Sequence, residues 1–161
     1  MAVAATVFDY LQHENIHYDI VPHPLTDSAA ESARASVLPL FDVIKSVVLI
    51  DGENRLMAVI PADRSLNIKQ INLVMGAHYQ LDTESDIERI FSDCVSGAVP
   101  GLGQAYNIPV IWDDALAKEE DVYFEAGDHR ELIHLSHQQF SKIMKRWPHG
   151  DISVPRKATQ G

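Results

Sequence analysis

The sequence has few of the features that mark secreted, disulfide-stabilised or membrane proteins. It contains a single cysteine, Cys94, among 161 residues, so no internal disulfide can form. It also lacks a charged-then-apolar signal at the N-terminus and any long apolar stretch without charges. We therefore expect a soluble, cytoplasmic protein with no membrane-spanning segment.

Basic residues are also scarce, with 13 Lys and Arg against 23 Asp and Glu and a formal net charge of −10. This balance argues against a protein that wraps extended nucleic acid with a broad basic surface. Any contact with nucleic acid is expected to be small and local. An acidic surface also keeps proteins in solution, so the charge by itself identifies no partner.

Several familiar catalytic and cofactor motifs are absent. The eight histidines are scattered, with no HExxH pattern and no CxxC partner for Cys94, so we predict neither a metal nor another cofactor. There is no GxSxG turn for a serine hydrolase. Cys94 follows a predicted helix, whose dipole disfavours a thiolate there, so this residue is expected to pack in the core.

Hydrophobic periodicity and capping residues predict a single domain of mixed helices and strands. Capping signals place helix starts at Thr6, Ser28, Thr83 and Ser136, and a further helix over residues 65–75 is expected to end at Gly76. Apolar runs rich in β-branched and aromatic residues predict strands within residues 16–21, 43–50, 56–61, 110–112, 122–124 and 131–135.

The order of these elements indicates the fold class. Strands and helices do not alternate strictly, which favours a mixed α/β fold with a mixed or largely antiparallel sheet flanked by helices. Hydrophobic residues make up 46% of the chain, enough for a core without a disulfide or structural metal. Residues 1–147 are expected to form the domain, and residues 148–161, with Gly150 and Pro155, a loose C-terminal tail.

Lys45 stands near the start of a predicted buried strand, in the run Val-Ile-Lys-Ser-Val-Val-Leu-Ile at residues 43–50. A cation in such a strand must reach water at the strand end or meet an anion, so Lys45 is a candidate ligand-binding residue. The alternative is that its stem covers apolar surface while its ammonium lies in water or pairs with a carboxylate such as that of Asp42.

A second candidate is the loop of residues 96–103, Ser-Gly-Ala-Val-Pro-Gly-Leu-Gly, which we call the cavity loop. Its glycines allow backbone amides to approach a carbonyl or phosphate group closely. The loop lacks the Lys-Ser/Thr ending of a P-loop and the glycine spacing of a dinucleotide-binding turn. An ordinary irregular connection remains the alternative.

Several separated segments together resemble the YbaK / prolyl-tRNA synthetase insertion-domain family of aminoacyl-tRNA editing proteins. The matching segments, in the family's order, are the Lys45 strand and residues 58–64, 97–103, 108–113 and 124–129. The resemblance implies a compact YbaK-like α/β fold with a bent mixed sheet. It also implies hydrolysis of the ester that joins a wrong amino acid to the 3′ end of tRNA.

The resemblance also implies roles for individual residues. Lys45 takes the position of the family's essential lysine, which holds the charged substrate, and Gly97 begins a loop that resembles the GxxxP motif, whose backbone surrounds the aminoacyl group. Gly101 stands where the family usually has proline, and Pro100 precedes it. Catalytic roles are thus implied for Lys45, Gly97, Pro100 and Gly101, and substrate contacts for Ala98, Val99, Gly103, His129 and Arg64.

This assignment agrees with the chemistry of ester hydrolysis. Negative charge develops on the carbonyl oxygen, and oriented backbone N–H groups of the cavity loop can stabilise it without a covalent intermediate. Lys45 would anchor a phosphate of the terminal adenosine or complement nearby charge. His129 is either a polar contact at the pocket or a hairpin-turn histidine, and Arg64 is a candidate for the rim.

Three functional hypotheses follow. The first is a freestanding deacylase that acts in trans on the acceptor end of mischarged tRNA. The second is a non-catalytic binding or regulatory module with the same fold, which the glycine at position 101 keeps open. The third is a subunit that works when docked on an aminoacyl-tRNA synthetase or another protein, with the acidic segment 118–121 as either a contact or a solvated loop.

Overall fold

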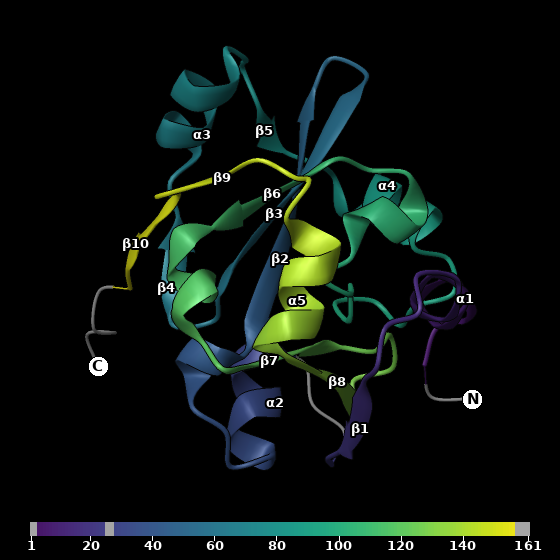
Figure 1. Ribbon diagram of the computed structural model, residues 1–161. Coiled ribbons are helices and arrows are strands. Elements are labelled where there is room, and N and C mark those ends of the chain that lie inside the picture. Colours follow the sequence, from purple (N-terminus) through teal and green to yellow (C-terminus); the bar gives the residue numbers. More distant parts are fainter. Residues whose placement is uncertain (1–2, 25–27, 157–161) are drawn as a thin grey trace, which may run out of the picture.

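A five-stranded mixed sheet forms the centre of the molecule (Figure 1). The structure, a computed structural model, describes residues 3–24 and 28–156. The strand order is β5-β2-β3-β6-β9, with β5, β2 and β3 antiparallel and β6 and β9 parallel to their neighbours. The bounds are β2 (Ile44–Asp51), β3 (Asn54–Pro61), β5 (Gln80–Leu81), β6 (Val110–Asp113) and β9 (His149–Gly150).

Two smaller antiparallel sheets complete the strands. One has the order β1-β8-β7 and the other pairs β10 with β4. The bounds are β1 (Asp19–Pro22), β4 (Arg64–Leu66), β7 (Asp121–Glu125), β8 (Glu131–Ser136) and β10 (Ser153–Pro155). An isolated bridge between Val43 and Tyr123 connects the start of β2 to β7. The predicted fold class, a mixed α/β domain, is confirmed.

Side-chain caps begin four of the five α-helices in the described residues, and the one that was not predicted is Asn67, whose side chain accepts a hydrogen bond from the Gln70 N–H. Ser28, Thr83 and Ser136 each accept a hydrogen bond from the backbone N–H three positions later, as predicted. Gly76 ends the third helix with φ of 62°, also as predicted. The predicted start of this helix at Ser65 is wrong, because Ser65 lies in β4 and the helix begins at Ile68. The helices are α1 (Ala5–His13), α2 (Ala29–Ala35), α3 (Ile68–Met75), α4 (Glu84–Ile90) and α5 (His137–Met144).

The predicted cap at Thr6 is wrong. Helix α1 begins at Ala5, and Thr6 lies in its first turn. The backbone N–H of Thr6 instead donates a hydrogen bond to the Asp93 carboxylate across 2.9 Å. A carboxylate 87 positions away along the chain thus satisfies the helix start, and a local capping pattern cannot reveal such a partner.

The expectation of a loose C-terminal end is wrong for residues 148–156. Strand β9 extends the central sheet beside β6, and β10 pairs with β4. Between these two strands, Ile152 is fully buried. The packed part of the chain therefore reaches at least Arg156, and residues 157–161 lie outside the described residues.

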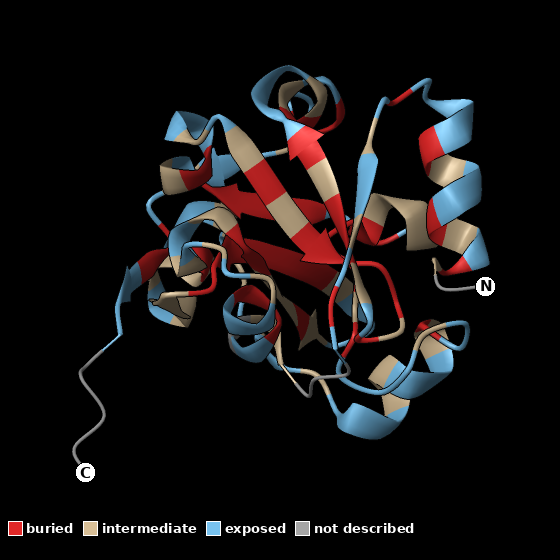
Figure 2. Ribbon diagram, turned by 90° about the horizontal axis from the view of Figure 1, so that it is seen from below, coloured by how far each residue is buried: buried red, intermediate tan, exposed pale blue. Residues whose placement is uncertain are grey.

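Alternate residues of β3 face two hydrophobic cores, one on each side of the central sheet. Met57 and Val59 belong to the core that includes Phe140 of α5, whereas Ala58 and Ile60 belong to the core that includes Ile71 of α3. Figure 2 shows the buried positions concentrated on the central strands and the exposed positions on the outer faces of the helices. Within residues 3–24 and 28–156, no helix combines the length and apolar character needed to cross a membrane.

Candidate functional site

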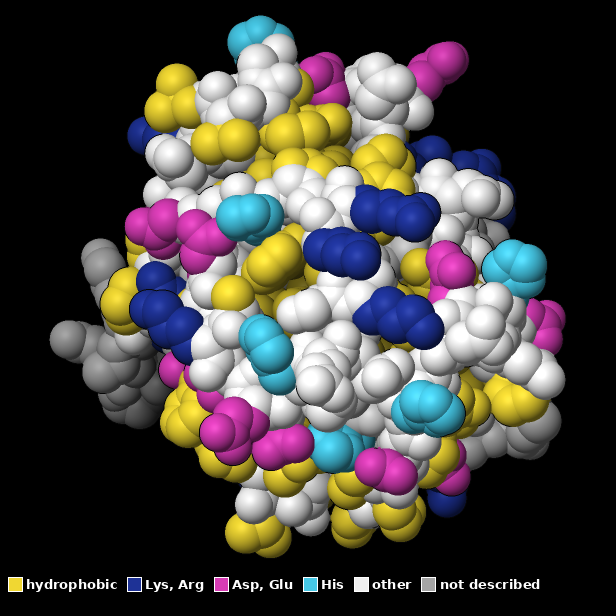
Figure 3. All heavy atoms as spheres, viewed as in Figure 1, with side chains coloured by type: hydrophobic (Ala, Val, Ile, Leu, Met, Phe, Trp, Pro, Cys, Tyr) yellow, Lys and Arg dark blue, Asp and Glu magenta, His cyan; other side chains and the backbone are white. Residues whose placement is uncertain are grey.

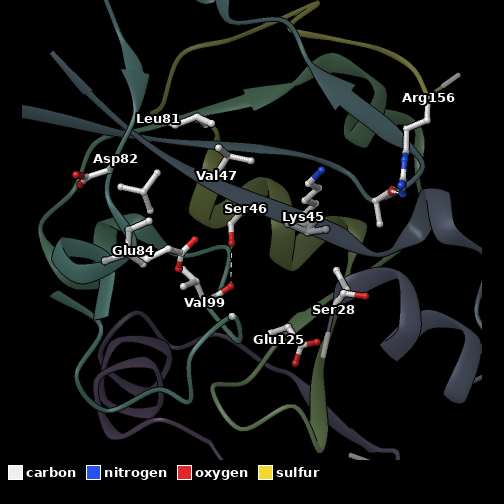
Figure 4. Close-up of a pocket in the computed structure, with 16 residues that line it drawn as sticks. Ser28, Lys45, Ser46, Val47, Leu81, Asp82, Glu84, Val99, Glu125 and Arg156 are labelled. Atoms are coloured by element: carbon white, nitrogen blue, oxygen red, sulfur yellow. Dashed lines mark hydrogen bonds between the residues drawn. The ribbon is translucent and has the colours of Figure 1, made fainter. Parts of the chain in front are cut away.

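A cavity of about 430 Å³ lies beside the first half of β2 (Figure 4). Strand β5 pairs with β2 only at Leu49 and Ile50, so the edge of β2 before these residues has no strand beside it in the central sheet. Lys45 and Ser46 of this segment line the cavity together with Gly97 and Val99 of the cavity loop. The lysine and the glycine-rich loop predicted from the sequence therefore lie at one cavity.

Lys45 occupies the cationic side of this cavity. Its side chain is half-buried, and among the described residues no carboxylate lies within ion-pair distance of its ammonium, so the alternative pairing with Asp42 is absent. Burial, followed by the charge of Arg156, lowers the pKa of Lys45. Arg156 lines the cavity on the same side (Figure 4), which gives an anionic ligand two cations to contact.

A hydrogen bond fixes the cavity loop to β2. The hydroxyl of Ser46 donates to the carbonyl oxygen of Val99 across 2.8 Å. Gly97 adopts a positive φ of 83°, a conformation that glycine takes without strain. Gly97 and Val99 line the cavity, whereas Ala98 and Pro100 of the same loop are buried in the protein interior. Because Gly97 has no side chain, its backbone lines the cavity directly.

The two later glycines of the loop serve close packing. A Cβ atom at Gly101 would lie 2.9 Å from Cγ2 of Ile44, a contact too short for real carbon atoms. A Cβ atom at Gly103 would lie 3.0 Å from Cβ of Met57. Neither glycine lines the cavity. Gly101 thus fits against the buried side chain of Ile44, and the preceding Pro100 restricts the backbone.

A buried carboxylate, that of Glu125, lines the cavity at the end of β7. It is 4% exposed, and the Ser32 hydroxyl donates a hydrogen bond to its Oε1 across 2.5 Å. Its Oε2 has no hydrogen-bond partner among the described residues. Burial raises the pKa of Glu125, while the Ser32 hydrogen bond and the charge of His129 oppose that rise.

His129 is hydrogen-bonded to the first residue of the cavity loop. It is 3% exposed, and its Nε2–H donates to the carbonyl oxygen of Ser96 across 2.9 Å. Its Nδ1 lies 3.7 Å from Oε1 of Glu125, too far for a hydrogen bond. His129 is not among the residues that line the cavity, and its φ of 58° is typical of a turn. The structure therefore connects His129 to the loop and to Glu125.

Arg64 lies apart from the cavity. Its Nε donates to the Ser153 hydroxyl across 2.6 Å, and its Nη2 donates to the Ser153 carbonyl oxygen across 2.8 Å. These bonds join β4 to β10 and place the Arg64 guanidinium away from the cavity lining. Arg156, which follows β10, takes the position at the cavity that the sequence suggested for Arg64.

Other groups considered from the sequence lie outside the cavity. Cys94 is partly buried, and burial raises the pKa of its thiol to about 12, so a reactive thiolate is disfavoured. Its Sγ lies 3.3 Å from the hydroxyl of Tyr106. In the part of the chain that the structure describes, no three His, Cys, Asp or Glu side chains come together to hold a metal ion.

Comparison with known families finds one match that spans most of the chain. The family profile of the aminoacyl-tRNA editing domain matches residues 23–143. This range includes Lys45, the cavity loop, Glu125 and His129, and it ends before Arg156. No protein with a curated function matches the sequence.

Solved structures share the fold at low sequence identity. The hypothetical protein APE2540 superposes with a TM-score of 0.82 at 20% identity, over 92% of this chain and 99% of that one. A candidate trans-editing enzyme for prolyl-tRNA synthetase superposes with a TM-score of 0.81 at 19% identity, over 94% and 96% of the two chains. A candidate signal transduction protein from Marinobacter aquaeolei gives a TM-score of 0.74 at 15% identity, over 92% of this chain and 30% of that one.

Proposed function

The chain belongs to the aminoacyl-tRNA editing domain family, and from this membership and the cavity we propose that it is a freestanding deacylase. It would hydrolyse the ester of a mischarged tRNA in trans and release the wrong amino acid from the acceptor end. An enzyme of this kind would work in the cytoplasm, where aminoacyl-tRNAs are used. Docking on a synthetase stays a prediction.

The observation that carries this proposal is the position of Lys45 and the cavity loop at one cavity. The Lys45 ammonium offers a charge to a phosphate of the terminal adenosine, and Arg156 offers a second one. The Ser46–Val99 hydrogen bond holds the loop backbone beside the lysine. A charged anchor and a rigid peptide backbone are therefore available to the same substrate.

The chemistry we propose needs no nucleophilic side chain. Water attacks the ester carbonyl carbon, the carbonyl oxygen becomes negatively charged, and backbone N–H groups of the cavity loop stabilise that charge. The free hydroxyl of the substrate's terminal ribose would orient the water. The carbon–oxygen bond to the ribose then breaks, and the leaving ribose oxygen takes a proton.

The acidic surface is compatible with this substrate. On the face shown in Figure 3, Lys and Arg side chains form small groups among neutral and acidic ones, not a continuous basic band. A domain that binds only the acceptor end needs few phosphate contacts. We therefore expect weak affinity for tRNA and a strong dependence of catalysis on the few cations at the cavity.

The test is a deacylation screen with purified protein and a panel of mischarged tRNAs, with the correctly charged tRNAs as controls. We expect hydrolysis of at least one mischarged tRNA well above its spontaneous rate, and no acceleration for the matching correct pair. If the protein binds these tRNAs and hydrolyses none of them, the non-catalytic binding module is the better description. If it neither binds nor hydrolyses them, the proposed function is wrong.

A further inference from the structure

We propose that the Glu125 carboxylate binds the α-ammonium group of the aminoacyl ester, so that the site selects substrates with a free amino group. This inference rests on the proposed function, because it names a second contact of the same substrate in the same cavity. It concerns the end of the substrate opposite the phosphate.

The first support is the unused hydrogen-bonding capacity of Glu125. Its Oε1 is occupied by the Ser32 hydroxyl, whereas its Oε2 has no partner among the described residues, although the side chain is 4% exposed. A buried carboxylate oxygen without a donor is costly, and most such oxygens in proteins have a partner. Because Glu125 lines the cavity, a ligand that enters the cavity can supply the donor.

The second support comes from the other carboxylates at the cavity. Asp82 is already held by Arg55, whose Nε lies 2.6 Å from the Asp82 Oδ2. Glu84 is exposed, so water screens its charge. Among the described lining residues, Glu125 alone is both buried and without an ionic partner at hydrogen-bond distance. It is therefore the carboxylate to which a cation would bind most selectively.

The third support is the arrangement of charge across the cavity. Figure 4 shows the Lys45 side chain directed toward the Arg156 side and away from Glu125. The cavity thus has a cationic side and, apart from it, a buried carboxyl group. The aminoacylated terminal adenylate of a tRNA has the same pattern, with its 5′-phosphate near one end and an ammonium at the other. An ester oriented by both ends would place its carbonyl group between them, beside the cavity loop.

The position of Glu125 is also coupled to that loop. His129 lies 3.7 Å from the Glu125 Oε1 and donates a hydrogen bond to Ser96, the residue before Gly97. Ser32 fixes the carboxylate from α2. The carboxylate is therefore held before the substrate arrives, which reduces the entropy lost on binding.

Binding of stable substrate analogues tests this inference. The probes are amide-linked 3′-aminoacyl-adenosine 5′-phosphates that carry glycine, alanine, serine or cysteine, each with a free or an N-acetylated amino group. By calorimetry, the wild type should bind the best free-amine probe about 10- to 100-fold more tightly than its acetylated form. Glu125→Gln, which keeps the size and the Ser32 contact, should bind the two forms equally.

Two further variants separate the charge of Glu125 from its structural role. Glu125→Asp keeps a carboxylate and should retain part of the preference for the free amine. Glu84→Gln removes an exposed carboxylate from the rim of the same cavity and should keep the full preference, because exposed charges are screened. Thermal melting of each variant identifies any loss of folding.

Because the amide probes are not hydrolysed, the outcome is independent of turnover. The inference is overturned if the wild type binds both forms equally, if Glu125→Gln keeps the wild-type preference, or if no probe binds. A general-base role for Glu125 would leave the binding preference intact in Glu125→Gln, and is therefore one of these contrary results. An inactive wild type in the deacylation screen contradicts the proposed function. The role of Glu125 is decided separately, by comparing how wild type and Glu125→Gln bind the free-amine and N-acetylated probes.

Discussion

The hydroxyl of Ser46 donates a hydrogen bond to the carbonyl oxygen of Val99, across 2.8 Å and 53 positions of the chain. Ser46 follows Lys45 on β2, and Val99 lies in the middle of the cavity loop. The bond therefore sets the distance between the cation and the peptide groups that would act on the same ester. It is a single connection whose removal changes the loop without changing the charge of the cavity.

We predict that Ser46→Ala lowers the rate of deacylation about 3- to 10-fold and destabilises the protein by ~1 kcal/mol, the usual net contribution of one hydrogen bond. Single-turnover hydrolysis and urea unfolding measure the two effects. Ser36→Ala is the matched control, because the Ser36 hydroxyl is buried and has no hydrogen-bond partner among the described residues. Its removal should leave stability unchanged or slightly raised. An unchanged rate in Ser46→Ala would mean that the loop is held by other contacts.

Gly101→Ala should destabilise the protein by about 1–3 kcal/mol, because the new methyl group would lie 2.9 Å from Cγ2 of Ile44. The cost should be non-additive with Ile44→Ala, which removes the clashing atom, so the double variant should be more stable than the sum of the two single effects predicts. Gly150→Ala is the control, since its methyl group would meet nothing closer than 3.9 Å. Additive effects in urea unfolding would contradict the packing role of Gly101.

Residues whose structure depends on near neighbours in the chain were predictable from the sequence. The caps at Ser28, Thr83 and Ser136 and the glycine end of α3 are confirmed, because each bond spans only a few residues. The start of α1 was not predictable, because its N–H partner is the distant Asp93. The same limit applies to the C-terminal segment, where β10 depends on its pairing with β4.

At the cavity, too, the residues identified from the sequence are those with a local pattern, and the residues missed are those that distant parts of the chain bring there. Lys45 and the cavity loop were identified from local pattern and family resemblance. Arg156 gave no signal, because only the pairing of β10 brings it to the cavity. Glu125 lay within a matching segment, but its burial and its unpartnered oxygen depend on α2 and on His129. The position predicted for Arg64 could not be judged from charge alone, because Ser153 binds its guanidinium.

The acidic group around Glu119 should make stability depend on pH. Burial, then the hydrogen bond to Asp42 and the charges of Asp42 and Asp63, raises the pKa of Glu119 from 4.5 to about 7. The folded state therefore holds this proton more tightly than the unfolded state, and the contribution of Glu119 to stability falls as pH rises from about 4.5 to about 7. Glu119→Gln cannot ionise, so its stability relative to wild type should be higher at pH 8 than at pH 4.5.

Urea unfolding of both proteins at the two pH values measures this difference, and the effects of titrating groups remote from Glu119 cancel in the comparison. Glu120→Gln, at an exposed neighbouring position, is the control and should differ from wild type equally at both pH values. If the free energy of unfolding of Glu119→Gln differs from that of wild type by the same amount at both pH values, the repulsion from Asp42 and Asp63 does not destabilise the folded protein.

The most direct test of the proposed mechanism compares wild type with Lys45→Ala on the best mischarged tRNA, by single-turnover hydrolysis and thermal melting. Lys45 is half-buried at the cavity and has no ionic partner among the described residues, so its loss should have little effect on the melting temperature. Loss of a charge-assisted contact in the transition state should cost roughly 2–4 kcal/mol, or about one and a half to three decades in rate. A rate reduced by this amount in a protein that melts like wild type is the predicted result. Near-wild-type turnover in Lys45→Ala would contradict the account.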